Sequence, residues 1–262
     1  MDVLYEVEDD ALVPTGYTRG PWDPRHQHAG PPSGLLARAV EAEAGIAGGQ
    51  VVRLAIDILR PVPLAPLEIA VRTMRPGRRV EQLEAVLVLA ADGTELMRAS
   101  AWRMRTEVVP LADGLGAPDP PPAPPEDCRA GVRPSFWPDE VAYADALEWR
   151  FLSGEFQEMG PAVCWTRMKV ALVAGETITP LEHLLVMGDA ASGISATLDW
   201  ATWTFVNVDF DVTLERPPEG EWLAMDAVTR PGELGAATCS AVLSDTRGRV
   251  GSSSQALLIA PR

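Results

Sequence analysis

The residue of this chain most suited to chemistry is Asp189, a carboxylate on a helix face that should be apolar. The segment Thr179-Pro180-Leu181-Glu182 predicts a helix start, with a threonine N-cap and a glutamate that closes a capping box. Leu181 and Leu185 fall on the inward face of this helix, and Asp189 follows on the same face. A buried carboxylate needs polar partners or an opening to water, so Asp189 is a candidate catalytic group. The alternative is that the helix ends near Asp189 and the carboxylate faces solvent.

An internal repeat organises the chain. Arg60-Pro61 matches Arg216-Pro217 at an offset of 156 residues, and Arg75-Pro76-Gly77 matches Arg230-Pro231-Gly232 at an offset of 155. Around these turns both halves share one order, in which four strands are separated by an Arg-Pro turn, an Arg-Pro-Gly turn and a glycine turn. Each half carries one helix ahead of its strands. We therefore predict an α+β fold in which two antiparallel sheets pair within one chain and cover each other's edges.

The boundaries of the halves follow from helix and linker signals. The first helix follows Gly30-Pro31-Pro32-Ser33 and is predicted to end near Gly45. Between the halves lies a proline run, residues 119–125, that fits neither a helix nor a central strand. The predicted organisation is an N-terminal domain at residues 1–110, a Pro-rich linker at 111–140 and a C-terminal domain at 141–262.

The two halves differ at three positions that bear on chemistry. When the repeats are aligned, a polar residue of the second half replaces the residue of the first. The three pairs are Val40 with Asp189, Val51 with Asn207, and Ser100 with Gln255. The alternative for Asn207 is a solvated strand face. The alternative for Gln255, which shares the apolar face of the last strand, is a structural amide that satisfies its own hydrogen bonds.

Composition excludes several classes of function. The net charge of −15 disfavours nucleic acid as a partner. No apolar run is long enough for a membrane span, and the first residues lack the features of a signal peptide, so a cytoplasmic location is predicted. The three cysteines suggest neither a disulfide framework nor a zinc cluster. His26 and His28, near Asp23, are weak metal candidates to which we assign structural or solvent roles, and we predict no metal or cofactor.

Four segments, in their order and spacing, are typical of one family. They are Gly30-Pro31-Pro32 before the first helix, the turn Leu59-Arg60-Pro61, the segment Gly220-Glu221-Trp222 and the closing run Gly251-Ser252-Ser253-Ser254-Gln255. With them the chain resembles the double-hotdog acyl-CoA thioesterases of the type II kind and their thioesterase-like relatives. The resemblance implies that each half is a hotdog, a long helix wrapped by a curved antiparallel sheet. It also implies acyl-CoA as the substrate and a homo-oligomer, a dimer of double hotdogs.

The resemblance implies an activity and a set of residues. The water-activating residues of that family are an Asp on the second helix, a Thr or similar residue on the next strand, and a Gln on the last strand. They fall here on Asp189, Asn207 and Gln255, the three positions at which the halves differ. The expected reaction is direct attack of water on an acyl-CoA thioester, which gives a free acid and coenzyme A. Asn207 departs from the family's threonine, which changes the reach of the side chain.

Two further sites are expected. Backbone N–H groups of Ser33 and Gly34, in the first turn of the first helix, are candidates to stabilise the oxyanion, because helix N-termini present free donors. Four arginines around the Arg-Pro-Gly turn could receive the phosphates of coenzyme A. They are Arg72, Arg75, Arg78 and Arg79. The alternative is that these arginines only solvate a hairpin on an acidic protein.

Two other functions remain open. The chain could be a hotdog protein that binds acyl-CoA or lipid without catalysis, an interpretation that Asn207 in place of threonine leaves open. A purely structural role would predict no ligand-sized cleft beside Asp189. Free-thiol release from a panel of acyl-CoAs would discriminate catalysis from binding.

Overall fold

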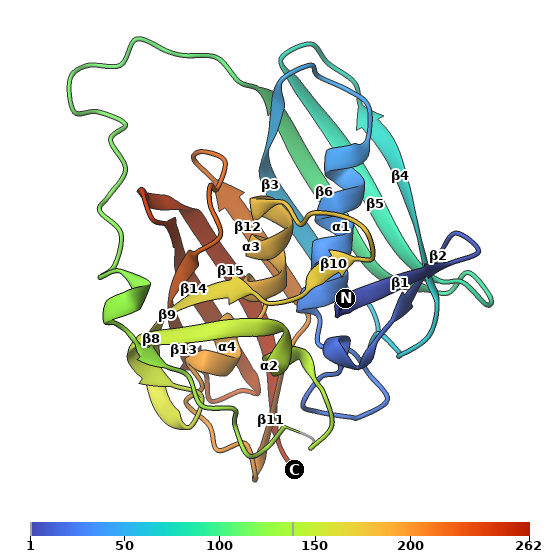
Figure 1. The fold of residues 1–262 in the computed structure, drawn as a ribbon, viewed down its shortest axis with the longest axis vertical. Helices are drawn as coiled ribbons and strands as arrows, with labels where there is room; N and C mark the ends of the chain where they lie inside the picture. The colour runs from blue at the N-terminus through green and yellow to red at the C-terminus, as the bar shows by residue number, and fades with distance from the viewer. Residues whose placement is uncertain (1, 138) are drawn as a thin grey trace.

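The computed structural model describes residues 2–137 and 139–262, which form two helix-and-sheet halves (Figure 1). The elements of the first half are β1 (Val3–Glu8), β2 (Ala11–Pro14), the 3-10 helix η1 (Gly16–Thr18), α1 (Gly30–Ala42), β3 (Gly49–Ile58), β4 (Leu67–Arg75), β5 (Val80–Leu89) and β6 (Glu95–Arg105). The elements of the second half are the 3-10 helix η2 (Pro125–Asp127), β7 (Arg129–Ala130), α2 (Tyr143–Ala146), β8 (Leu147–Glu155), β9 (Glu158–Met168), β10 (Ala171–Val173), α3 (Pro180–Gly188), α4 (Ala191–Ile194), β11 (Trp203–Asn207), β12 (Asp209–Leu214), β13 (Leu223–Pro231), β14 (Ala236–Asp245) and β15 (Gly248–Pro261).

One continuous sheet joins the two halves. The strands that follow α1 pair in the order β4-β5-β6-β3, and the order then continues through β12-β15-β14-β13. The seam between the halves is the antiparallel pair of β3 and β12, in which Ile56 lies opposite Phe210. This pairing confirms the predicted α+β fold with two antiparallel sheets joined in one chain. β1 pairs with β10 in parallel, so the N-terminus is also fixed to the second half.

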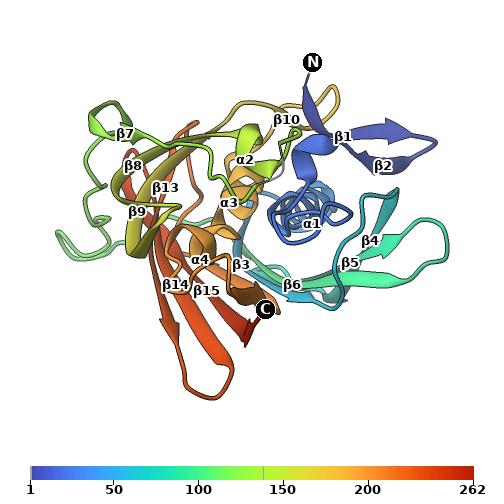
Figure 2. The same cartoon turned by 90° about the horizontal axis from the view of Figure 1, so that it is seen from below.

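The two long helices lie side by side within the curve of the sheet (Figure 2). Glycines on α1 permit their close approach. A Cβ atom on Gly30 would meet the backbone carbonyl oxygen of Val186, and one on Gly34 would lie 2.6 Å from the Cγ2 atom of Val186. The start of α1 therefore packs directly against the end of α3.

α3 begins as the sequence predicts. The Thr179 hydroxyl oxygen accepts a hydrogen bond from the Glu182 N–H at 3.1 Å, and the Glu182 carboxylate accepts one from the Thr179 N–H at 3.0 Å. The helix ends at Gly188, so Asp189 occupies the C-cap. α1 ends at Ala42, three residues before the predicted Gly45, because Glu43 is already extended, with φ −66° and ψ 130°.

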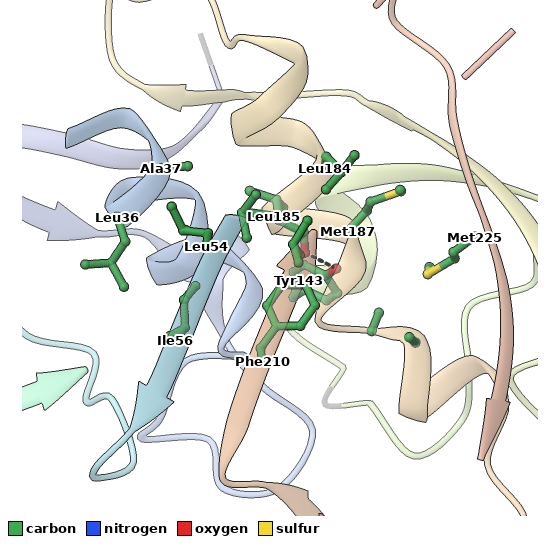
Figure 3. Close-up of a cluster of buried hydrophobic side chains, with 14 of the residues drawn as sticks. Leu36, Ala37, Leu54, Ile56, Tyr143, Leu184, Leu185, Met187, Phe210 and Met225 are labelled. Atoms are coloured by element: carbon green, nitrogen blue, oxygen red, sulfur yellow. Dashed lines mark hydrogen bonds between the residues drawn. The ribbon is translucent and has the colours of Figure 1, made fainter. Parts of the chain in front are cut away.

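A shared hydrophobic core fixes the two helices to the sheet (Figure 3). The labelled core residues come from α1, α3, α2 and the strands of both halves: Leu36, Ala37, Leu54, Ile56, Tyr143, Leu184, Leu185, Met187, Phe210 and Met225. Tyr143 also donates a hydrogen bond of 2.7 Å from its hydroxyl to the Val186 carbonyl oxygen in the last turn of α3. The end of α3, and with it Asp189, is thus held from several sides.

The segment predicted as a linker is not uniform. Residues 106–124 contain neither helix nor strand. By contrast, β7 pairs with β8, and Trp137 is buried in the core of the second half. Because aromatic side chains bury large apolar surfaces, the chain folds back onto the second half well before residue 141.

Candidate active site

Asp189 is buried although it lies outside the helical residues of α3. Its exposed fraction is 4%, and it lines a cavity of about 330 Å³. The last turn of α3 is enclosed by β12, where a Cβ atom on Gly188 would lie 2.7 Å from the ring of Phe210. The helix does end where the alternative interpretation placed it, but the carboxylate faces a cavity rather than bulk solvent.

The structure brings Asn207 and Gln255 to Asp189. The side-chain amide of Asn207 donates a hydrogen bond of 2.6 Å to Oδ1 of Asp189. The side-chain amide of Gln255 donates at 2.9 Å to the backbone carbonyl oxygen of Asp189 and lies 3.5 Å from its Oδ1. Asn207 is the last residue of β11, and Val208 separates it from β12.

The side chains of Asn207 and Gln255 lie on different sides of Asp189. Asn207 lines the cavity beside Asp189, whereas Gln255 is 2% exposed and lies behind Asp189. Among the described residues, the Gln255 Oε1 atom has no hydrogen-bond partner. Gln255 can therefore restrain the carboxylate, and Asn207 can contact both the carboxylate and a bound molecule.

His28 contacts the other oxygen of the same carboxylate. Its Nδ1 atom lies 2.9 Å from Oδ2 of Asp189, and its ring stacks on Tyr143 with centroids 3.8 Å apart and planes at 4°. The Gly30 N–H also points at this Nδ1 atom, at 3.1 Å. The contact with a carboxylate is shorter and charge-assisted, so we assign the Nδ1 proton to the bond with Asp189.

His28 departs from the sequence analysis, which gave it a structural or solvent role. It lies outside the repeat, so the comparison of halves could not find it. The available signal was its position directly before the start of α1, because this helix start packs against the end of α3. His26 also lines the cavity, but its Nδ1 atom lies 3.7 Å from Oδ2 of Asp23. Within residues 2–137 and 139–262, no group of three or more His, Cys, Asp or Glu side chains could hold a metal ion.

Ser33 and Gly34 do not reach the cavity. The Ser33 N–H donates to the Ala29 carbonyl oxygen at 3.0 Å, and Gly34 is enclosed against Val186. Ala29, the N-cap of α1, does line the cavity, and among the described residues its N–H has no hydrogen-bond partner. The structure thus places a candidate donor just ahead of the helix, since Pro31 and Pro32 have no N–H and the Ser33 N–H is bonded to the Ala29 carbonyl oxygen.

The four arginines around the Arg-Pro-Gly turn lie away from the cavity. The cavity is lined by residues 58–62, which precede β4, whereas the turn follows β4, a strand about 30 Å long at the usual rise per residue. Figure 1 shows this turn at the opposite end of β4 and β5. Arg72 pairs with Glu84 at 2.7 Å. Among the described residues, the arginine that lines the cavity is Arg60.

Comparison with known proteins identifies both halves. Residues 18–104 match the family model of the acyl-CoA thioesterase N-terminal domain, and residues 125–259 match that of the acyl-CoA thioesterase C-terminal domain. No curated protein sequence matches the chain. In the described part of the chain, no helix has the length and apolar character needed to cross a bilayer.

Solved structures share the fold at low sequence identity. A protein from Thermobifida fusca proposed to be a thioesterase II is 19% identical, with 95% of this chain and 91% of that chain covered and a TM-score of 0.74. A protein of unknown function with a hotdog fold from Alicyclobacillus acidocaldarius is 15% identical, with 95% and 92% covered and a TM-score of 0.74. The acyl-CoA thioesterase II TesB2 from Mycobacterium marinum is 16% identical, with 89% and 90% covered and a TM-score of 0.65. The fold is therefore two hotdog domains in one chain.

Proposed function

Because the chain belongs to the acyl-CoA thioesterase family, we propose that it hydrolyses an acyl-CoA thioester to a free acid and coenzyme A by direct attack of water. The observation that supports this most is the buried carboxylate of Asp189 on the wall of a ligand-sized cavity. Its two oxygens are held by an amide and an imidazole. A carboxylate fixed in this way can orient a water molecule and take its proton.

The proposed reaction uses Asp189 as the general base. A water molecule beside Asp189 and Asn207 gives a proton to the carboxylate while its oxygen bonds to the thioester carbon. The C–S bond then breaks, and the proton passes from Asp189 to the coenzyme A thiolate. A carboxylate has about four acceptor positions, so the contacts with Asn207, Gln255 and His28 leave room for the water.

The oxyanion that forms on the thioester oxygen requires a hydrogen-bond donor. We assign this role to the Ala29 N–H in place of the Ser33 and Gly34 groups, because Ala29 lines the cavity and, among the described residues, its N–H has no hydrogen-bond partner. Arg60, at the cavity, is a better placed partner for the phosphates of coenzyme A than the arginines of the β4–β5 hairpin.

The test is thiol release from acyl-CoA substrates by the native protein and by Asp189→Asn. The substitution keeps the shape of the side chain and removes the base, so we expect kcat to fall roughly 10²- to 10⁴-fold with the fold intact. Asp226→Asn is the matched control, because Asp226 is exposed on β13 far from the cavity wall. Circular dichroism of all three proteins checks the fold. Unchanged hydrolysis by Asp189→Asn would reject the assignment of the base.

The binding alternative gives a different result in the same assay. Saturable binding of acyl-CoA without thiol release would identify a non-catalytic binding protein. The cytoplasmic location and the dimer of double hotdogs stay predictions.

A further inference from the structure

The cavity beside Asp189 has an aromatic wall. Of the 26 described residues that line it, seven are Phe, Trp or Tyr, whereas aromatic residues make up 6% of the chain. These side chains come from the loop before α1, from α2 and the segment before it, from the turn between β8 and β9, and from β11 and the segment before it. Segments far apart in sequence converge on this cavity, so its aromatic lining does not result from the composition of a single element.

The rings of this wall pack against one another. Trp200 stacks on Phe136 with centroids 4.0 Å apart and on Trp22 with centroids 4.9 Å apart. Phe205 closes the group with edge contacts to Trp200 at 4.4 Å and to Trp22 at 5.0 Å. Rings that support one another lose little freedom when a ligand binds, so this group forms a stiff wall of flat surfaces.

A second series of rings leads from the wall to the reacting groups. Phe136 lies beside Trp137, with centroids 6.4 Å apart, and Trp137 lies 5.9 Å from Tyr143. Tyr143 stacks on His28, which contacts Asp189. A ring attached close to the thioester carbon would therefore meet aromatic surface from the first atoms onward.

The cavity also limits the size of the acyl group. Its volume of about 330 Å³ lies near the lower end of the range that is usual for small-molecule sites. Behind Phe205 the next void is only about 10 Å³, so the cavity does not continue there as a tunnel. A compact acyl group, such as one ring with a short spacer, suits a cavity of this size better than a long straight chain such as palmitoyl.

We propose that the acyl group accepted by this site is compact and bears a ring, as in arylacetyl or aroyl thioesters, and is not a long straight chain. This inference rests on the proposed thioesterase function and names its substrate class. Ring-on-ring contact is the interaction that separates such a group from an alkyl chain of the same carbon number.

The test compares phenylacetyl-CoA with octanoyl-CoA, which have the same number of acyl carbons, and with palmitoyl-CoA. We expect kcat/KM to be roughly three- to tenfold higher for phenylacetyl-CoA than for octanoyl-CoA, and palmitoyl-CoA to be a poor substrate. Trp200→Leu should abolish the preference for the ring. Phe136→Leu tests the same wall if Trp200→Leu fails to fold. The control is Trp222→Leu, because Trp222 lies outside the cavity against Arg167 and should leave the preference unchanged.

Binding to Asp189→Asn separates the two proposals. Tighter binding of phenylacetyl-CoA than of octanoyl-CoA, measured by tryptophan fluorescence, supports the ring-binding site even if the native protein releases no thiol. In that case the thioesterase proposal alone fails. Equal or better binding and turnover of octanoyl-CoA would overturn the ring-binding proposal and leave thioester hydrolysis standing.

Discussion

At the scale of single residues, Asp189 depends on the groups that hold it. Asn207 donates to the carboxylate from the cavity side, whereas Gln255 donates to the backbone carbonyl oxygen of Asp189 from behind, so the two amides should differ in their effect on catalysis. Asn207→Ala removes a contact to both the carboxylate and the attacking water. We expect kcat to fall by roughly 10²-fold with a smaller change in KM, as measured by thiol release. An unaltered kcat would show that Asn207 does not position the water.

His28 fixes the second oxygen of Asp189, and its contribution can be measured in the same way. His28→Asn retains a donor near the position of Nδ1, whereas His28→Leu leaves Oδ2 without a partner and removes the polar group. We expect kcat to fall roughly tenfold or more in His28→Leu, with partial rescue in His28→Asn. Equal losses in the two variants would indicate that stacking on Tyr143, rather than the hydrogen bond, is the function of His28.

The sequence could identify part of this site because the two repeated halves of the chain can be compared with each other. Asp189, Asn207 and Gln255 each replace a residue of the first half, and the structure gathers all three. His28 has no such counterpart, and the packing of α1 against α3 that brings it to Asp189 is a tertiary contact. No local pattern records that contact. The Ser33 N–H, which was expected to be a free donor, instead donates to the Ala29 carbonyl oxygen at the start of α1, and Gly34 is enclosed against Val186.

At the scale of elements, the contact between α1 and α3 sets the geometry of the site. A methyl group on Gly30 would collide with the Val186 carbonyl oxygen and lie 3.2 Å from the Nδ1 atom of His28. Gly30→Ala should therefore separate the helices, at a cost of about 1–3 kcal/mol in the free energy of unfolding. Urea denaturation measures this loss. Thiol release by Gly30→Ala should fall more than the loss of folded protein explains, because a shift of the start of α1 also displaces His28 from Asp189.

The start of α3 carries a pH dependence. Burial raises the pKa of Glu182 to about 7, and the nearby carboxylate of Glu41 contributes. Because this value exceeds the ordinary 4.5, the stability that Glu182 provides is complete below pH 4.5 and is lost as the pH rises through about 7. Glu182→Gln stays neutral and can still accept from the Thr179 N–H.

The expected result is a higher Tm for Glu182→Gln than for the native protein at pH 8 and equal Tm values at pH 4.5. Glu233→Gln is the control, since Glu233 is exposed in the turn between β13 and β14. A Tm difference that does not change with pH would mean that Glu182 is already ionised in the folded protein.

The repeated strands were predictable from their turns, and the capping box fixed the start of α3 to the residue. The strands before α1 and those between α2 and α3 were not predicted, because no Arg-Pro or Arg-Pro-Gly turn marks them. The pairing of β1 with β10 joins residues far apart in the chain, so only the folded protein reveals it.

At the scale of the whole molecule, the pairing of β3 with β12 joins the sheets of the two halves into one continuous sheet. The predicted linker has two parts with different roles. Residues 106–124 contain neither helix nor strand, whereas Phe136 and Trp137, later in the same segment, line the cavity. Pattern reading located the proline run but could not foresee that Phe136 and Trp137 would become part of the site, since their partners lie in other segments.

The cavity draws on both halves, with His28 from the first and Asp189 from the second. In the internal repeat, the residue of the first half that corresponds to Asp189 is Val40, which is fully buried in the core. The second half supplies Asp189, and the first half supplies His28 and the helix α1 that packs against α3. Neither half alone contains the complete site, so substitutions in either half can alter it.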